Sequence, residues 1–76
     1  MRNMAVFSDR LRETRKLRGI TQKQMAEFLE ITEQAYQNYE YGKIKPNFDS
    51  LIALADFFDV SVDYLMGRTD EPEVNR

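Results

Sequence analysis

Side chains that can pair with base edges are concentrated between Glu33 and Asn38. Thr32, a good helix N-cap, precedes them. The early positions of the following helix that we expect to be exposed are Glu33, Gln34, Gln37 and Asn38. An amide can form two hydrogen bonds with adenine N6 and N7, and a carboxylate can accept from cytosine N4. In most helices such side chains form only a solvated surface, but the capped turn and the flanking basic residues favour base recognition here.

Groups suited to binding phosphate flank this row of side chains. Gln22 lies at the start of the preceding helix, where free backbone N–H groups and the helix dipole favour an anion. Lys43 and Lys45 follow the row, so we expect them to contact the nucleic-acid backbone beyond the end of this helix. The predicted phosphate contacts are Gln22, Lys23, Thr32, Lys43 and Lys45. Arg12, Lys16 and Lys23 could also be no more than solvated surface.

Catalytic and metal chemistry has little support in this composition. The chain has no Cys and no His, which removes disulfides, the usual general base and the commonest zinc ligand. The carboxylates show no spacing typical of an acid–base pair, and Tyr36, Tyr39 and Tyr41 have no base beside them. We therefore expect no enzyme activity, no catalytic residue, no metal and no cofactor.

Charge is unevenly distributed along the chain. The net charge of −2 argues against binding to a polyanion. Residues 1–46, however, contain nine Lys and Arg against six Asp and Glu, whereas residues 47–76 contain two against seven. This division gives one side suited to a polyanion and one acidic side. Chance segregation of solvated charges would explain it equally well.

Helix signals dominate, and no stretch shows the sustained alternation typical of strands. The expected helices run from Ser8 to Arg18, from the Thr21 cap past Leu29, from the Thr32 cap to Gly42, from about residue 48 with Asn47 or Asp49 as its cap, and from Ser61 through Met66. Thr21 and Gln24 have the spacing of a capping box. The side chains expected to point inward are Phe7, Leu11, Thr14, Met25, Ala26, Phe28, Leu29, Leu51, Ile52, Leu54, Ala55 and Phe58, with Leu17 less clear.

These elements predict a single all-α domain. Helices this short cannot share one long seam, so we expect a five-helix orthogonal bundle over residues 1–68. Residues 69–76 contain a proline and three acids, which predicts a flexible acidic tail. No apolar run is long enough to span a bilayer, and the start is too short for a signal peptide, so we expect a cytoplasmic protein without membrane contact.

The segment from residue 21 to residue 43 resembles the Cro/cI-type (XRE) helix-turn-helix family. The matching residues are Thr21 and Gln22, Ala26, Ile31 and Thr32, and Glu40, Gly42 and Lys43. Pro46, the apolar fourth helix and residues 59–67 continue the resemblance, which covers about residues 7–67. Because so many positions match in register, the resemblance is specific.

The resemblance implies a lambda-repressor-like DNA-binding domain of the kind found in phages and mobile elements. Its expected function is that of a repressor that binds a palindromic operator in the major groove as a homodimer. In the family, the glutamine matching Gln22 reaches a phosphate, and the residues matching Arg15 and Glu40 form a partly buried ion pair. We therefore expect Arg15 and Glu40 to hold the fold together and to touch DNA little.

Three residues depart from the family pattern. Glu30 occupies a turn position usually held by glycine, where φ is positive. Tyr36 replaces the usual Ile or Val, so its hydroxyl needs solvent or a partner. Glu33 at the front of the recognition helix repels phosphate, so that it either selects cytosine or indicates modest affinity for DNA.

Two questions stay open at the level of sequence. Tyr64, Met66 and Phe57 are candidates for a dimer patch, although Tyr64 and Phe57 could simply complete the core. A second hypothesis is a protein-interaction module on the same fold, antitoxin-like or partner-binding, in which Glu33 and residues 47–76 meet a basic partner. Salt dependence and base preference would distinguish the two hypotheses.

Overall fold

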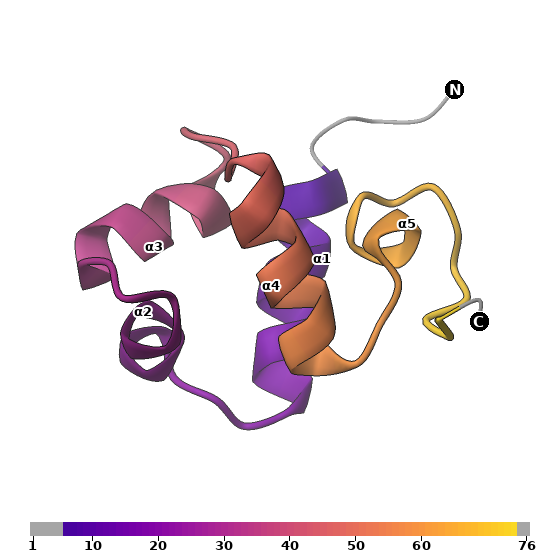
Figure 1. The fold of residues 1–76 in the computed structure, drawn as a ribbon, viewed down its shortest axis with the longest axis horizontal. Coiled ribbons are helices and arrows are strands. Elements are labelled where there is room, and N and C mark those ends of the chain that lie inside the picture. Colours follow the sequence, from indigo (N-terminus) through magenta and orange to yellow (C-terminus); the bar gives the residue numbers. More distant parts are fainter. Residues whose placement is uncertain (1–5, 75–76) are drawn as a thin grey trace.

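Residues 6–74 are described by the computed structural model, and they form five helices (Figure 1). The helices are α1 (Val6–Leu17), α2 (Gln22–Leu29), α3 (Glu33–Tyr41), α4 (Phe48–Phe58) and α5 (Val62–Leu65). This part of the chain contains no strand, so the all-α class expected from the sequence is confirmed. Positions 1–5 of the predicted domain and 75–76 of the predicted tail lie outside the described residues.

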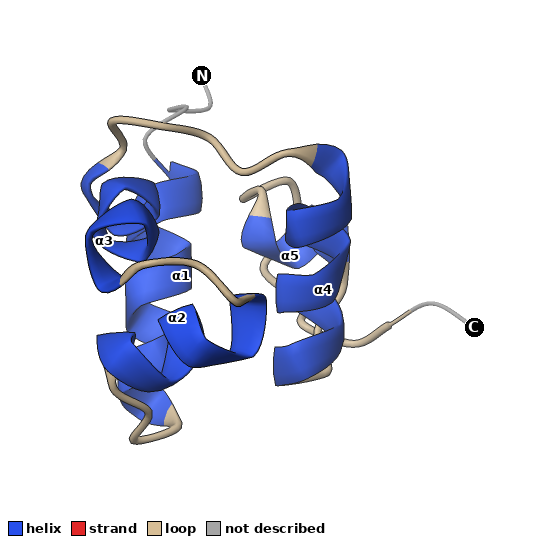
Figure 2. Ribbon diagram, turned by 60° about the vertical axis from the view of Figure 1, so that its left-hand side comes forward, coloured by secondary structure: helices blue, strands red, loops and turns tan. Residues whose placement is uncertain are grey.

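The helices pack as the orthogonal bundle that the sequence predicts. Helix α3 packs against α2 and α1, and α5 packs against α1 and α4. Figure 2 shows α1, α2 and α3 together on one side of the molecule, with α4 and α5 on the other. None of the helices within residues 6–74 is long and apolar enough to cross a membrane.

Short polar side chains begin four of these helices. In each case the side-chain oxygen accepts a hydrogen bond from a backbone N–H three residues later, and the caps are Thr21, Thr32, Asn47 and Ser61. Thr21 and Gln24 form the complete capping box. Each cap satisfies a backbone donor that the first helical turn leaves without a partner, which is why these helices begin where the sequence predicts.

Helix α1 differs from the sequence prediction at both ends. It begins at Val6, two residues before Ser8, and it ends at Leu17. Ser8 does not cap the helix, because its side chain is buried beside Gly42, where an added Cβ would lie 3.5 Å from Ser8 Oγ. Phe7 packs against the core, so its burial favours the extra turn at the start of α1.

The core lies where the five helices meet. Leu11, Met25, Tyr36, Leu54, Phe58 and Leu65 are all fully buried there. Three residues that were considered for the inward face are more exposed than expected: Leu17 at 83%, Phe28 at 43% and Ile52 at 37%. Phe28 lies at the edge of the bundle, where its ring packs against Phe57 with 4.5 Å between ring centroids. The apolar faces of α2 and α4 therefore extend beyond the buried core and leave some apolar side chains exposed.

The segment after α5 turns back along the bundle as far as it is described. The Ser61 N–H donates to the Pro72 carbonyl at 3.0 Å. Arg10 in α1 donates to the Thr69 carbonyl and forms an ion pair with Asp70 at 3.2 Å. These contacts connect residues 69–74 to α1 and to the start of α5, and the flexibility expected of this tail stays a prediction.

Candidate nucleic-acid interface

The turn between α2 and α3 fixes how the two helices of the motif meet. Glu30 has φ 59° and ψ 43°, the left-handed conformation that its turn position requires. The Ile31 N–H then donates to the Ala26 carbonyl at 3.0 Å, closing the end of α2. Ala26 is 3% exposed, and its small side chain allows α2 and α3 to approach closely. A non-glycine residue in this conformation costs about 1 kcal/mol, which the surrounding packing must offset.

The candidate base-contacting residues of α3 fall into two groups. Glu33 and Gln34 are exposed on the first turn of the helix. Gln37 and Asn38 were expected to be exposed but are half-buried. Gln34 Nε2 donates to Asn38 Oδ1 at 3.4 Å, one helical turn away. Gln34 and Asn38 therefore present their amide groups on one side of α3, beside Glu33.

A buried ion pair ties α1 to the end of α3. Arg15 Nε lies 2.6 Å from Glu40 Oε2, and Arg15 Nη2 lies 3.0 Å from Glu40 Oε1. Arg15 also donates to the Ile20 carbonyl at 2.9 Å, so the same guanidinium holds the loop between α1 and α2. Two parallel hydrogen bonds make this a bidentate pair, the strong geometry for Arg and a carboxylate. The pair thus forms with the partners expected from the sequence.

The hydroxyl of Tyr36 completes this buried cluster. It donates to Glu40 Oε2 at 2.5 Å, which supplies the partner that a tyrosine in this core position requires. Burial and this hydrogen bond both raise the pKa of Tyr36 well above its usual value. Burial opposes the ionisation of Glu40, but hydrogen bonds from Arg15, Tyr36 and Gln22 outweigh it and hold the pKa of Glu40 below its usual range. The hydrogen bond to Glu40 likewise raises the pKa of Arg15.

Gln22 and Gln37 extend the cluster to the surface. Gln22 Nε2 donates to Glu40 Oε1 at 3.0 Å, and Gln37 Nε2 donates to Gln22 Oε1 at 3.1 Å. Sequence reasoning missed the pairing of Gln22 with Gln37. Gln37 lies three residues before Glu40 and therefore on the same side of α3, which was the available signal. The link also requires the approach of α2 to α3, which no local pattern contains.

Basic side chains surround the start of α2 and follow α3. An open hollow beside Gln22 is lined by Arg12, Arg15, Lys16, Lys23 and Glu33, together with the loop between α1 and α2. Arg12 is already engaged there, because it donates to Asp9 at 2.7 Å and to the Glu40 carbonyl. Lys43 and Lys45 are exposed in the loop after α3, and Thr32 is exposed at its start. The candidate phosphate-binding groups therefore lie at both ends of α3.

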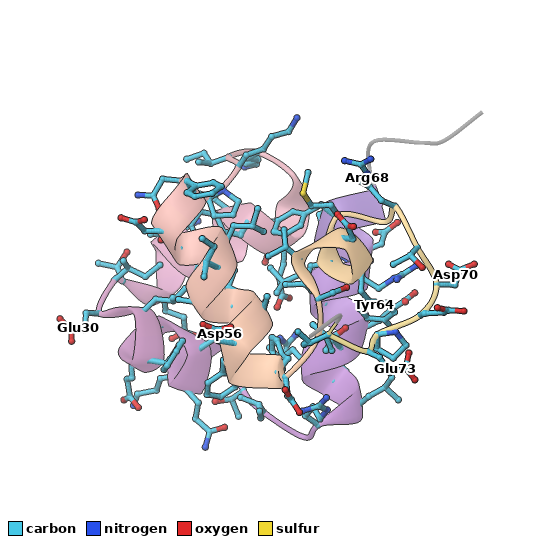
Figure 3. All side chains as sticks on the ribbon, turned by 45° about the vertical axis from the view of Figure 1, so that its right-hand side comes forward. Glu30, Asp56, Tyr64, Arg68, Asp70 and Glu73 are labelled. Atoms are coloured by element: carbon cyan, nitrogen blue, oxygen red, sulfur yellow. The ribbon has the colours of Figure 1, made fainter. Side chains whose placement is uncertain are left out.

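Exposed acidic side chains are most numerous on a different part of the surface. Figure 3 shows Asp56 on α4 and Asp70 and Glu73 on the segment that follows α5, while Glu30 projects from the turn between α2 and α3. The exposed acids of α4, α5 and the following segment are Asp49, Asp56, Asp59, Asp63, Asp70, Glu71 and Glu73. Carboxylates thus predominate on α4, α5 and the following segment. Five further acids are exposed on α1, α2, α3 and the turn between α2 and α3: Asp9, Glu13, Glu27, Glu30 and Glu33.

The residues considered for a dimer patch are placed unequally. Tyr64 is half-buried, with the Arg10 guanidinium 4.1 Å from the centre of its ring. Phe57 packs against Phe28 and Phe58. Met66 is exposed and lines an apolar hollow with Phe7, Pro46 and Leu51. Met66 and Phe57 are exposed to similar extents, 37% and 36%; Met66 adjoins the hollow near the loop after α3, whereas Phe57 adjoins the exposed ring of Phe28.

Comparisons with known proteins agree with this geometry. The sequence pattern of the family described as Helix-turn-helix matches residues 11–65. The uncharacterized HTH-type transcriptional regulator YobD of Bacillus subtilis is 43% identical over 68 residues, covering 90% of this chain and 61% of that protein. The cryptic phage CTXphi transcriptional repressor RstR of Vibrio cholerae is 40% identical over 67 residues, covering 86% of this chain and 60% of that protein.

Solved structures give the same result. The P22 c2 repressor protein, solved in complex with a synthetic operator, superposes with a TM-score of 0.74 at 28% identity, covering 80% of this chain and 92% of that one. The matched relatives are transcriptional regulators rather than enzymes, in agreement with the expectation from composition. This chain spans about three fifths of the length of the two curated relatives.

Proposed function

This chain belongs to the Cro/cI-type helix-turn-helix family, and we propose that it is a sequence-specific DNA-binding regulator that represses transcription. One observation carries the proposal. Helix α3 is fixed by the Thr32 cap, the Glu30 turn and the Arg15–Glu40 pair, and it presents Glu33 and Gln34 to solvent beside the start of α2. A rigid helix with exposed amide and carboxylate groups is suited to the major groove, which presents a distinct donor and acceptor pattern for each base pair.

We assign base contacts to three residues of α3. Gln34 and Asn38 share one side of the helix, and their amides match the donor and acceptor pair of adenine. Glu33, at the front of the helix, accepts a hydrogen bond from cytosine N4. A carboxylate in this position also repels phosphate, so it disfavours DNA in which no cytosine compensates for the repulsion.

Phosphate contacts are assigned to the two ends of α3. Gln22, Lys23 and the free N–H groups at the start of α2 bind one segment of the backbone. We assign Thr32 to the same segment, because its neighbour Glu33 lines the hollow beside Gln22. Lys43 and Lys45 bind the segment beyond α3. Such contacts set the register of the protein on the duplex without specifying sequence.

A second copy of this chain is the proposed partner on DNA. Met66, 37% exposed, lines a hollow with Phe7, Lys45, Pro46 and Leu51. Ile44 and Phe48, 52% and 74% exposed, lie next to Lys45 and Pro46 in the sequence, and we define the six apolar residues Phe7, Ile44, Pro46, Phe48, Leu51 and Met66 as the apolar patch. The apolar patch lies beside the loop that follows α3, so pairing of two copies through it brings both recognition helices to one face of the duplex. Two helices about 34 Å apart would enter successive major grooves of a palindrome.

A cytoplasmic location and repression rather than activation are further parts of this proposal. Two repressors among the similar proteins support repression: RstR and the P22 c2 repressor. Operator occupancy measured together with transcription from a promoter that overlaps the operator would test it. Transcription that rises with occupancy would contradict repression.

A protein-interaction module is the second candidate function. The acidic side of the molecule favours it, because α4, α5 and the following segment gather exposed carboxylates away from α3. A basic partner bound there would leave Gln34 and Lys43 untouched. Substitutions at Gln34 and Lys43 that abolish function would exclude this candidate.

Selection of bound sequences from a random pool of duplex DNA tests the main proposal. We expect a palindrome whose half-sites lie about one helical turn apart, with cytosine and adenine enriched where Glu33 and Gln34 meet the bases. If no sequence is enriched even at low salt, sequence-specific DNA binding is excluded.

A further inference from the structure

A chain of hydrogen bonds leads from the buried ion pair to the surface of α3. Arg15 donates to Glu40, Gln22 donates to Glu40 Oε1 at 3.0 Å, and Gln37 donates to Gln22 Oε1 at 3.1 Å. Gln22 comes from α2, whereas Glu40 and Gln37 come from α3. The chain therefore couples the start of α2 to the recognition helix through side chains alone.

The chemistry of Glu40 decides which way the Gln22 amide faces. The pKa of Glu40 lies below its usual range, so this carboxylate is ionised at neutral pH and can only accept hydrogen bonds. Gln22 must then direct its NH2 group toward Glu40, which turns its carbonyl oxygen toward Gln37. That oxygen needs a donor, and the NH2 group of Gln37 supplies one.

The same arrangement leaves one hydrogen of the Gln22 amide directed elsewhere. A primary amide nitrogen carries two hydrogens, and Glu40 takes one of them. Gln22 lines the open hollow with Lys16 and Lys23, at the start of α2, where the helix dipole favours an anion. An amide held at both its nitrogen and its oxygen loses little further rotamer freedom when a phosphate binds.

Gln37 itself is poorly placed to contact bases. Its NH2 group is directed to Gln22 in α2, whereas Gln34 and Asn38 bond to one another along α3. Gln37 and Asn38 are both half-buried, so the direction of the amide distinguishes them. We propose that Gln37 is a positioning residue, which together with Glu40 holds the Gln22 amide in the orientation that binds a DNA phosphate, and that it does not contact bases. This inference rests on the proposed DNA-binding function and revises the role that the sequence suggests for Gln37.

Gln37→Met is the direct test, because methionine keeps the length of the side chain and removes the donor. The selected operator and a shuffled duplex should both be bound about two- to tenfold more weakly, since one neutral hydrogen bond is lost. Base preferences in a repeated pool selection should not change. Gln34→Met is the matched control on the same helix, and it should change the preferred base instead. Gln37→Ala serves as a second variant, and circular dichroism checks that both Gln37 variants are folded.

A double-substitution cycle separates positioning from direct contact. In a Gln22→Ala background, Gln37→Met should produce no further loss of affinity, because the group that it positions is gone. A loss that persists in this background, or a changed base preference at one position, would overturn the proposal.

The positioning role can also be measured without DNA. The side-chain 15N amide resonance of Gln22, assigned by its disappearance in Gln22→Ala, should show less motion in the wild type than in Gln37→Met, in which only the bond to Glu40 remains. Equal mobility in the two proteins would overturn the proposal. Should the wild-type protein select no DNA sequence, the proposed function fails, and this measurement alone then decides whether Gln37 orders Gln22.

Discussion

Glu40 accepts hydrogen bonds from Arg15, Tyr36 and Gln22, although its side chain is only 1% exposed. A buried carboxylate is costly unless its oxygens are satisfied, and no buried side-chain N or O atom in the described residues lacks a partner. Tyr36 contributes to this cluster because its hydroxyl is a hydrogen-bond donor at a position where the family usually has Ile or Val. The cluster holds α1, α2 and α3 in register before any DNA is bound.

Removal of Arg15 should be severe for this reason. Arg15→Met leaves the charge of Glu40 buried without its main partner, and we expect the free energy of unfolding to fall by about 3–5 kcal/mol. Urea titration followed by circular dichroism measures this. Lys16→Met, at the exposed neighbouring residue, should change the free energy of unfolding by less than about 0.5 kcal/mol. Similar losses in the two variants would contradict the structural role of Arg15.

The cluster also predicts the dependence of stability on pH. Because the pKa of Glu40 is lower in the folded state, its contribution is present above the usual value of 4.5 and is lost as the pH falls through the folded pKa. The pKa of Tyr36 is raised, so its contribution is present below 10.0 and is lost as the pH rises above that value. Urea titrations across pH should therefore show a weaker acid dependence in Glu40→Gln and a weaker alkaline dependence in Tyr36→Phe. Curves parallel to the wild type would contradict the two assignments.

Glu33 is the residue whose change should alter specificity most visibly. In Glu33→Gln the acceptor for cytosine N4 becomes an amide suited to adenine, so the preferred base at one position of each half-site should change. A single good contact of this kind discriminates by about 1–3 kcal/mol, which pool selection and fluorescence anisotropy both detect. Glu13→Gln, an equal change of charge at an exposed residue of α1, should leave base preference unchanged. An unchanged preference in Glu33→Gln would remove Glu33 from the interface.

At the scale of elements, the turn between α2 and α3 is held under local strain. Glu30 adopts φ 59° without being glycine. Glu30→Gly should therefore raise the free energy of unfolding by about 1 kcal/mol, whereas Glu27→Gly inside α2 should lower it by a similar amount. Thermal unfolding of the two variants compares them directly. A loss of stability in Glu30→Gly would show that the side chain of Glu30 has a stabilising contact that outweighs the strain.

The helix ends show what the sequence could predict. Thr21, Thr32 and Ser61 act within three residues of themselves, so a local pattern was sufficient to place them. For the fourth helix the pattern left Asn47 and Asp49 as alternatives, and Asn47 is the cap. The predicted start of α1 was wrong because Ser8 is buried beside Gly42, the C-cap of α3, a contact that no local pattern contains. Local signals thus define an element, while its exact extent depends on packing against distant elements.

In the candidate site too, some features were predictable from the local sequence, whereas others depend on packing between helices. Glu33 and Gln34 follow a cap on an exposed turn, so their exposure was predictable from their positions. The amide of Gln37 is directed to Gln22, which is fifteen residues away in the sequence and belongs to α2. The apolar patch was predicted only at Met66, because the exposure of Ile44 and Phe48 depends on how the loop after α3 meets α4.

At the scale of the molecule, the apolar patch predicts cooperative binding. Phe48 is 74% exposed, so Phe48→Asn should leave the fold intact and weaken pairing of two copies. Binding to the full palindrome should lose affinity, whereas binding to an isolated half-site should not. Leu17→Asn, at a residue 83% exposed on α1, should affect neither measurement. If Phe48→Asn binds the palindrome like the wild type, the apolar patch is not the dimer contact.

The distribution of charge favours one orientation of the molecule relative to DNA. Basic groups lie near both ends of α3, and acidic groups gather on α4, α5 and the segment after them. Acidic side chains on α4 and α5 repel the phosphates of DNA, so the charge pattern favours an orientation in which α3 faces the DNA. A net charge of −2 is therefore compatible with DNA binding, because the distribution of charge matters more than its sum.

The most direct test of sequence-specific DNA binding is the affinity for the selected palindrome and for a shuffled duplex, measured over a series of salt concentrations. The palindrome should be bound at least about 10³-fold more tightly at physiological salt, and both affinities should fall steeply as salt rises, because phosphate contacts release counterions. Equal affinities for the two duplexes, or no binding at low salt, would contradict the assignment of α3 as a recognition helix.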